Sequence, residues 1–192
     1  MELDGLIFVT SNLGKLREAE AVLGCTLRHR ALDIDELQSL DLETVVRHKA
    51  RSAYARIGEP VLVEDTSLEL AGLAGFPGPL IRWLLATVGP AGICRIAHCF
   101  GDPRATVHCV VCACNGEDEV IGHGIVHGMI SESAKGQRGF GWDSTFIPDD
   151  GGGGTYGEME ESEKNAISHR RRAFEALRDA LAVRDEVPGS GF

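Results

Sequence analysis

The sequence predicts an α/β protein, and three features of its pattern support that class. Short apolar, β-branched runs at residues 6–9 and 60–63 have the composition of buried strands, and helical apolar periodicity follows the first run and precedes the second. Two further runs, residues 105–114 and 119–130, are divided by Asn-Gly-Glu-Asp and predict a long antiparallel hairpin. With 192 residues, 43% of them hydrophobic, the chain can bury a core as one domain or two tight lobes.

The first predicted strand ends in a polar turn that starts a helix. Leu16, Ala19 and Val22 recur at helical spacing until Gly24. Either Ser11 or Asn12 can cap this helix, and the free amides of its first turn then form an anion site that a lysine at position 15 would strengthen. A capped turn with a solvated lysine explains the same residues equally well, because the glycines of a P-loop are absent.

The second predicted helix covers residues 42–57 and follows an acidic strand or loop at residues 33–38. Its apolar residues lie on one face, and Gly58 ends it. Lys49 lies beside the apolar face, so it is either solvated or leans over a cleft. The strand after this helix ends at Val63 in Glu-Asp-Thr, and carboxylates at the end of a buried strand suit a magnesium ion that also binds substrate phosphates.

A glycine and proline bend at residues 72–79 precedes a helix at residues 80–85, and Pro90 starts a further amphipathic segment. In the hairpin that follows, Cys109 would point away from Cys112 and Cys114, so buried free thiols are favoured over a zinc site or disulfides. We assign no role to the scattered histidines of this region, which are His98, His108, His123 and His127.

The C-terminal third contains the residues that suggest a ligand. Residues 140–143, Phe-Gly-Trp-Asp, place two aromatic rings beside a carboxylate, and a strand resumes at residues 144–148. We interpret the glycine-rich residues 149–154 as a surface loop or lid. Ser162 is predicted to cap the last helix, whose first two turns hold Lys164, His169 and Arg170. An apolar slot beside hydrogen-bond donors and cations suits a nucleobase and its phosphates. At the C-terminus, residues 185–192 should be disordered.

The charge balance limits the possible partners. A net charge of -10 argues against a nucleic-acid groove or an anionic membrane surface, although it allows a small anion to bind locally. The N-terminal residues lack a basic segment and a long apolar run, so we expect a cytoplasmic protein. The few lysines, at positions 15, 49, 135 and 164, include three that coincide with the predicted phosphate contacts.

Five motifs, in this order, together resemble the inosine triphosphate pyrophosphatase family, whose members hydrolyse non-standard purine nucleoside triphosphates. They are Thr-Ser-Asn-x-x-Lys at 10–15, Val-Glu-Asp-Thr at 63–66, Gly-x-Pro-Gly-Pro at 75–79, Phe-Gly-Trp-Asp at 140–143 and Glu-Lys-Asn-Ala-Ile-Ser-His-Arg at 163–170. The resemblance spans residues 7–181. One departure is Ser11, where many members carry glycine, and its added hydroxyl should not block an amide site.

The resemblance implies an elongated mixed β-sheet flanked by helices, two lobes with a central cleft, and a homodimer. We therefore expect residues 1–184 to form one two-lobed domain. It also implies magnesium-dependent conversion of a triphosphate to the monophosphate and diphosphate. Glu36 and Asp65 would hold the metal, and Asp65 would also be the base. The implied substrate-binding residues are Thr10, Ser11, Asn12, Leu13, Gly14, Lys15, Lys49, Thr66, Arg82, Phe140, Gly141, Trp142, Asp143, Lys164, His169 and Arg170.

The base itself offers a way to select substrates. Hypoxanthine and xanthine present an acceptor at position 6 and a donor at position 1, whereas adenine reverses both, and unpaired buried groups can discriminate by roughly 10⁴-fold. Guanine must be excluded at position 2 by contacts that the sequence leaves open. Two alternatives stay open: a related pyrophosphatase acting on modified pyrimidine or standard nucleotides, and a nucleotide-binding regulator without catalysis.

Overall fold

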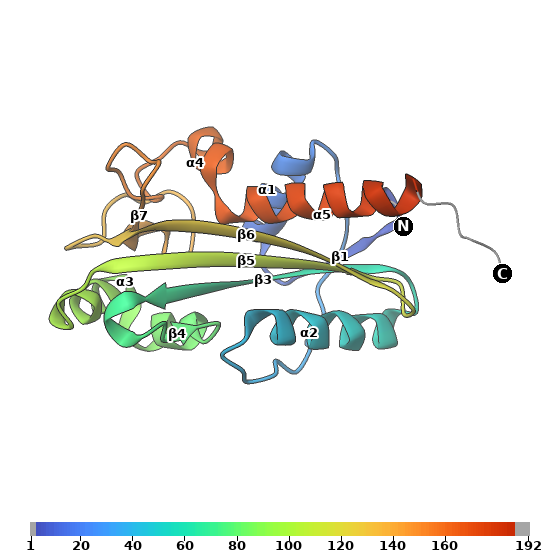
Figure 1. Ribbon diagram of the computed structural model, residues 1–192, viewed down its shortest axis with the longest axis horizontal. Coiled ribbons are helices and arrows are strands. Elements are labelled where there is room, and N and C mark those ends of the chain that lie inside the picture. The colour runs from blue at the N-terminus through green and yellow to red at the C-terminus, as the bar shows by residue number, and fades with distance from the viewer. Residues whose placement is uncertain (1–2, 187–192) are drawn as a thin grey trace.

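Three long strands form the centre of the fold in this computed structural model, which describes residues 3–186 (Figure 1). They are β3 (Val61–Leu70), β5 (Arg104–Cys114) and β6 (Glu119–Ile130). β5 pairs antiparallel with both β3 and β6, from one end of each strand to the other. The predicted hairpin at residues 105–130 is therefore confirmed.

Four short strands complete a mixed sheet in the order β2-β1-β3-β5-β6-β7, with β4 pairing the far end of β3. The short strands are β1 (Ile7–Val9), β2 (Arg28–Arg30), β4 (Pro77–Gly78) and β7 (Phe146–Pro148). β1 runs parallel to β2 and β3, whereas the other pairs are antiparallel. The predicted mixed α/β class is confirmed, and residues 33–38 form a loop rather than a strand.

β3 runs further than the sequence predicted. The apolar run ends at Val63, but the strand continues to Leu70, so Glu64, Asp65 and Thr66 lie in its middle rather than at its end. β1 pairs with β3 only through Leu62. The carboxylates therefore lie just beyond the end of a parallel strand, next to the segment that enters the first helix.

Among residues 3–186, five α-helices flank the sheet: α1 (Leu13–Leu23), α2 (Leu42–Ile57), α3 (Ile81–Cys99), α4 (Glu161–Ile167) and α5 (His169–Glu186). α1 and α2 end at Gly24 and Gly58 as predicted, both in the left-handed conformation that glycine adopts without cost. Gly89 interrupts α3 before Pro90, which matches the two predicted helical segments.

The predicted last helix is in fact two helices. Ser168 is extended and separates α4 from α5, so His169 is the first residue of α5. Ser162 is not the cap, because the Glu160 carboxylate and Glu163 form a reciprocal capping box instead. α5 continues to Glu186, so residues 185 and 186 of the predicted disordered tail are helical, and residues 187–192 lie outside the described chain.

The apolar core is divided along the long strands. α5 and α2 pack on opposite sides of the sheet at the β1 end (Figure 1), and a further cluster, with α3, covers the other end. Between Val63 and Leu68, β3 carries only Glu, Asp, Thr and Ser. This polar interval marks the junction between the two halves of the molecule. No helix within residues 3–186 is long and apolar enough to cross a membrane.

Candidate active site

The turn between β1 and α1 brings a capped helix start to the polar interval of β3. Asn12, one of the two predicted caps, accepts hydrogen bonds from the amides of Gly14 at 2.9 Å and Lys15 at 3.2 Å. Its own amide donates to the Thr10 hydroxyl. Two amides of the first turn are therefore already bonded, so an anion here would rely mainly on the lysine side chain.

Asp65 lies between two of the lysines that the sequence assigned to phosphates. Lys15 Nζ lies 3.2 Å from one carboxylate oxygen and Lys49 Nζ lies 3.3 Å from the other, while the Thr66 amide donates to the first. Burial acts to raise the pKa of Asp65, but the two ammonium groups outweigh it and hold that pKa well below its ordinary value. Asp65 is therefore ionised at neutral pH.

A chain of alternating charges connects this carboxylate to the C-terminal segment. In order along the chain, the groups are Asp65, Lys15, Glu64, Arg170, Glu18, Lys164 and Asp143. Arg170 contacts Glu64 at 3.0 Å and also binds Glu18, and Lys164 contacts Glu18 and Asp143 at 2.6 Å each. All members from Glu64 to Asp143 are buried. Burial acts to lower the pKa of Arg170, but Glu64 and Glu18 raise it overall, so the guanidinium stays charged.

The placement of Lys164 differs from that of the other two lysines. Its ammonium lies 4.9 Å from the centre of the Phe140 ring and 5.6 Å from that of Tyr156, between two carboxylates. This position favours a role at the aromatic end of the site over the phosphate contact that the sequence suggested.

A small cavity lies at the aromatic end. The residues that line it are Thr66, Phe140, Gly141, Trp142, Asp143, His169 and Arg170, all of which are among the predicted substrate-binding residues. Its free space is about 30 Å³, which suits a water molecule rather than a purine. The Phe140 ring, which lines the cavity, also packs against α1, since a Cβ on Gly14 would come within 2.6 Å of that ring. A purine would therefore need more space than the residues around this cavity leave.

His169 lies against the Trp142 ring, with 5.4 Å between ring centroids. Burial, followed by the nearby cations Arg170 and Lys164, lowers the pKa of His169 well below its ordinary value, so the imidazole is neutral. Its Nδ1 atom and Nε of Arg170 are buried without a hydrogen-bond partner. Unpaired polar atoms on residues that line a cavity are expected where a polar ligand binds.

Two predicted site residues pair with each other instead of joining this cluster. Arg82, near the start of α3, contacts the Glu36 carboxylate at 3.1 Å, and both residues are exposed. Glu36 is therefore held on the loop before α2 by a cation. Leu13, another predicted contact, is exposed at the start of α1.

Glu64, one of the carboxylates predicted after the apolar run of β3, joins the site, and so does Glu18, which the sequence did not single out. Glu18 lies one helical turn after Lys15, which is the only local signal for it. The Cys109 thiol is buried and donates a hydrogen bond to Glu64. Burial raises the pKa of Cys109 far above its ordinary value, so it stays a neutral thiol.

The cysteines follow the prediction. Cys109 packs in one core cluster, whereas Cys112 and Cys114 pack in the cluster on the opposite face, and all three are free. Within residues 3–186, no group of three or more His, Cys, Asp or Glu side chains is arranged to hold a metal.

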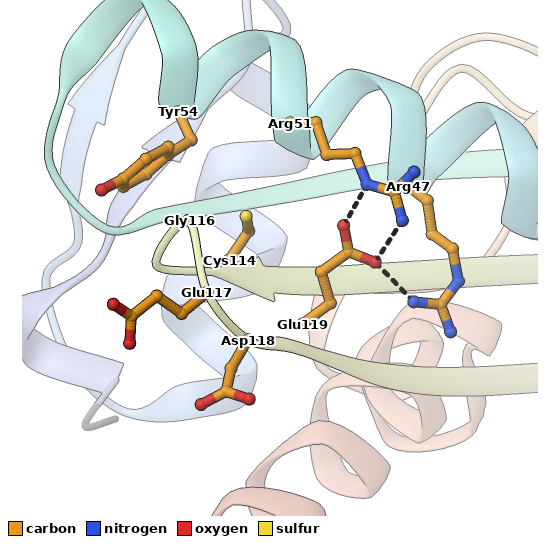
Figure 2. A pocket seen from close by; sticks show the side chains of 8 residues that line it. All are labelled: Arg47, Arg51, Tyr54, Cys114, Gly116, Glu117, Asp118 and Glu119. Atoms are coloured by element: carbon orange, nitrogen blue, oxygen red, sulfur yellow. Dashed lines mark hydrogen bonds and ion pairs between the residues drawn. The ribbon is translucent and has the colours of Figure 1, made fainter.

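A larger cavity of about 550 Å³ lies between α2 and the β5–β6 turn (Figure 2). It is lined by Arg47, Arg51, Tyr54, Cys114, Gly116, Glu117, Asp118 and Glu119. The Glu119 carboxylate binds both guanidinium groups, as the dashed lines of Figure 2 show, at 2.6 Å to Arg47 and 2.5 Å to Arg51. No predicted site residue lines this cavity, and its arginines are already neutralised.

The fold and the site together define a class: an α/β protein with a lysine-flanked carboxylate next to an aromatic cavity, suited to a phosphorylated aromatic ligand. The Ham1 family model matches residues 6–180, so this chain belongs to the Ham1 family.

Proteins with known names agree with this assignment. Inosine triphosphate pyrophosphatase 2 of Trypanosoma cruzi is 43% identical over 173 residues, covering 88% of each chain. Inosine triphosphate pyrophosphatase of Scheffersomyces stipitis is 41% identical and covers 91% of this chain and 96% of its own. The structure of a HAM1 protein from Coxiella burnetii superposes with a TM-score of 0.76 at 28% identity, over 93% of this chain and 99% of that one.

Proposed function

We propose that this protein hydrolyses non-standard purine nucleoside triphosphates, such as ITP, dITP and XTP, to the monophosphate and diphosphate. One observation carries the proposal: the cavity lined by the predicted base-binding residues connects, through buried ion pairs, to an ionised carboxylate flanked by two lysines. The relatives named inosine triphosphate pyrophosphatases match over most of their length, which supports the same substrate class here.

The donor set fits a magnesium nucleotide. Mg²⁺ prefers oxygen ligands and keeps several waters, so one or two carboxylates with substrate phosphates suffice. Asp65 would supply such a carboxylate, and Glu36 would supply a second if Arg82 released it. When bound, the ion would neutralise charge on the phosphates.

The side chains of the protein would bind the phosphates, accept the proton of the attacking water and bind the base. The triphosphate competes with Asp65 for the ammonium groups of Lys15 and Lys49, and this competition frees the carboxylate. Asp65 then accepts a proton from water as the water oxygen attacks and the phosphoanhydride bond breaks, releasing diphosphate. Neutral His169 and the buried Arg170 guanidinium present fixed hydrogen-bonding groups to the base edge.

A diphosphate-release assay with ITP, dITP, XTP, GTP and ATP, with and without Mg²⁺, tests the proposal. We expect kcat/KM for ITP to exceed that for ATP by roughly 10³-fold or more, and activity to vanish without a divalent cation. Replacing Asp65→Asn should lower kcat at least about 10²-fold while leaving the circular dichroism spectrum unchanged. Equal rates for ITP and ATP would refute the specificity, and an active Asp65→Asn variant would remove the base.

We also propose a cytoplasmic homodimer, as the family resemblance implies. The exposed face of β6 offers a candidate dimer surface. Buried residues alternate with more exposed ones along this strand, and Ile125 and Met129 are exposed between buried neighbours. Sedimentation equilibrium would give the mass of the assembly.

A further inference from the structure

Tyr156 belongs to an aromatic triangle behind the base cavity. Its ring centroid lies 6.1 Å from that of His169, with planes 25° apart, and 6.5 Å from that of Trp142. The Trp142 and His169 rings close the triangle at 5.4 Å. Trp142 and His169 line the cavity, whereas Tyr156 does not, so Tyr156 is the inner support of both.

The tyrosine backbone is fixed to the same turn. The Tyr156 amide donates to the Phe146 carbonyl at 3.0 Å, and the next amide, of Gly157, donates to the carbonyl of Asp143 at 2.9 Å. The Phe146 ring packs against Tyr156 at 5.3 Å. The position of the Tyr156 ring is therefore determined by the segment that builds the cavity.

Tyr156 also borders the charge chain. Lys164 Nζ lies 5.6 Å from its ring centroid, a distance at which an ammonium is attracted to an aromatic face. The Tyr156 hydroxyl is buried and has no hydrogen-bond partner among the described residues. The contacts that connect Tyr156 to the site are thus made by its ring and not by its hydroxyl.

We infer that Tyr156 is a positioning residue for base selection, whose ring holds His169, Trp142 and Lys164 in the arrangement that reads the purine edge. This inference rests on the proposed function. Tyr156 does not touch the base. Without its ring, His169 can tilt, and water can reach the imidazole from behind. A correct base then gains less from its hydrogen bonds, because the groups that bind it are no longer held in place.

The test compares Tyr156→Phe, which keeps the ring, with Tyr156→Leu, which removes it. We expect Tyr156→Phe to keep the ITP:ATP ratio of kcat/KM within about 3-fold of the wild type, whereas Tyr156→Leu lowers that ratio about 10-fold, mainly by raising KM for ITP. In ligand-free Tyr156→Leu, the His169 ring signals in NMR should shift and titrate at a higher pH, because burial keeps this imidazole neutral in the wild type.

Phe174→Leu is the matched control, since Phe174 is a buried ring that packs on Phe8 in the other half of the molecule. It should lower stability without changing the ITP:ATP ratio. If Tyr156→Leu does not fold, Tyr156→Met takes its place.

A folded ring-deleted variant with wild-type selectivity and unshifted His169 signals would overturn the inference, as would a Tyr156→Phe variant that loses selectivity as fully as Tyr156→Leu. Failure of the proposed function is a separate result, seen when the wild type itself prefers ATP or cleaves neither nucleotide. The His169 signals in the ligand-free protein still decide the role of the Tyr156 ring in that case.

Discussion

At the scale of single residues, Glu18 is a buried carboxylate that pairs with two buried cations. It is buried on α1, and its two carboxylate oxygens bind Lys164 and Arg170. Each cation is itself buried, so removing the carboxylate leaves two positive groups without water and with one partner fewer. Glu18 thereby connects α1 to the residues at the aromatic cavity.

Replacing Glu18→Ala should lower the free energy of unfolding by about 3–5 kcal/mol, because an uncompensated buried charge is costly. Urea denaturation at pH 7 measures it. Glu175→Ala is the control, since Glu175 forms a surface ion pair with Arg171 within α5, and it should cost less than about 1 kcal/mol. Equal losses in the two variants would show that the buried pairs contribute no more than a surface pair.

The sequence could predict the residues in compact motifs but not those defined by distant partners. Trp142 and His169 lie in segments with distinctive side chains, and the structure brings both to one cavity. Glu18 lies 146 residues from Lys164 and 152 from Arg170, so no local pattern shows that these charges meet. The Glu36–Arg82 pair, formed across 46 residues, was hidden for the same reason.

At the scale of elements, the contact between α5 and β6 places His169 and Arg170, which line the aromatic cavity. Gly122 and Gly124 lie where α5 crosses the strand, and a Cβ on Gly124 would come within 1.9 Å of the His169 carbonyl oxygen. The helix rests directly on the strand backbone at this point. His169 is the first residue of α5, so its distance from the sheet is set by the close contact of the α5 backbone with β6 at Gly124.

The substitution Gly124→Ala should therefore displace the start of α5 and lower kcat/KM for ITP about 10-fold or more, along with stability. Steady-state assays and thermal unfolding measure the two effects. Gly5→Ala is the control, because nothing lies within 4 Å of a Cβ at that position. Wild-type kinetics in Gly124→Ala would mean that the helix start can shift without moving His169 out of place.

Element boundaries were predictable where the backbone required a particular residue. Gly24 and Gly58 end their helices in the left-handed conformation, and the sequence showed both. The break at Ser168 was not visible, since apolar residues continue at helical spacing on both sides of it. The middle of β3 was hidden because polar side chains interrupt the apolar run while the backbone ladder to β5 continues.

At the scale of the whole molecule, buried charges at the junction of the two halves make stability depend on pH. Burial acts to raise the pKa of Glu64, but Arg170 and Lys15 lower it overall, and Asp65 is lowered similarly. The folded protein therefore holds these carboxylates ionised at a pH where the unfolded chain, with ordinary values of 4.5 and 3.8, takes up protons. Their contribution is present above those values and is lost as pH falls.

His169 adds a loss of stability that begins at a higher pH than the loss caused by the carboxylates. Its folded pKa lies below the ordinary value of 6.5, so the unfolded chain binds a proton first and stability falls as pH drops below about 6.5. We expect a loss of up to about 1.4 kcal/mol per pH unit between pH 6.5 and 5, and a steeper loss below about 4.5. Burial raises the pKa of Asp143, which opposes the second step in part.

Urea unfolding from pH 7.5 to 3.5 measures both steps. His169→Gln should flatten the first step, whereas His127→Gln, on the exposed face of β6, should leave it in place. A wild-type curve that is level down to pH 5 would contradict the neutral state of His169.

The continuity of the three long strands limits how the two halves of the molecule can move relative to each other. β3, β5 and β6 pass unbroken through both halves, so no flexible linker separates them. A movement of one half relative to the other would twist these strands, with the change shared among many backbone hydrogen bonds. Such a motion is a gradual torsion along the strands and not a rotation about a single hinge. Hydrogen exchange should then show a small and uniform increase in amide exchange rates along these strands, with no single residue exchanging much faster than its neighbours.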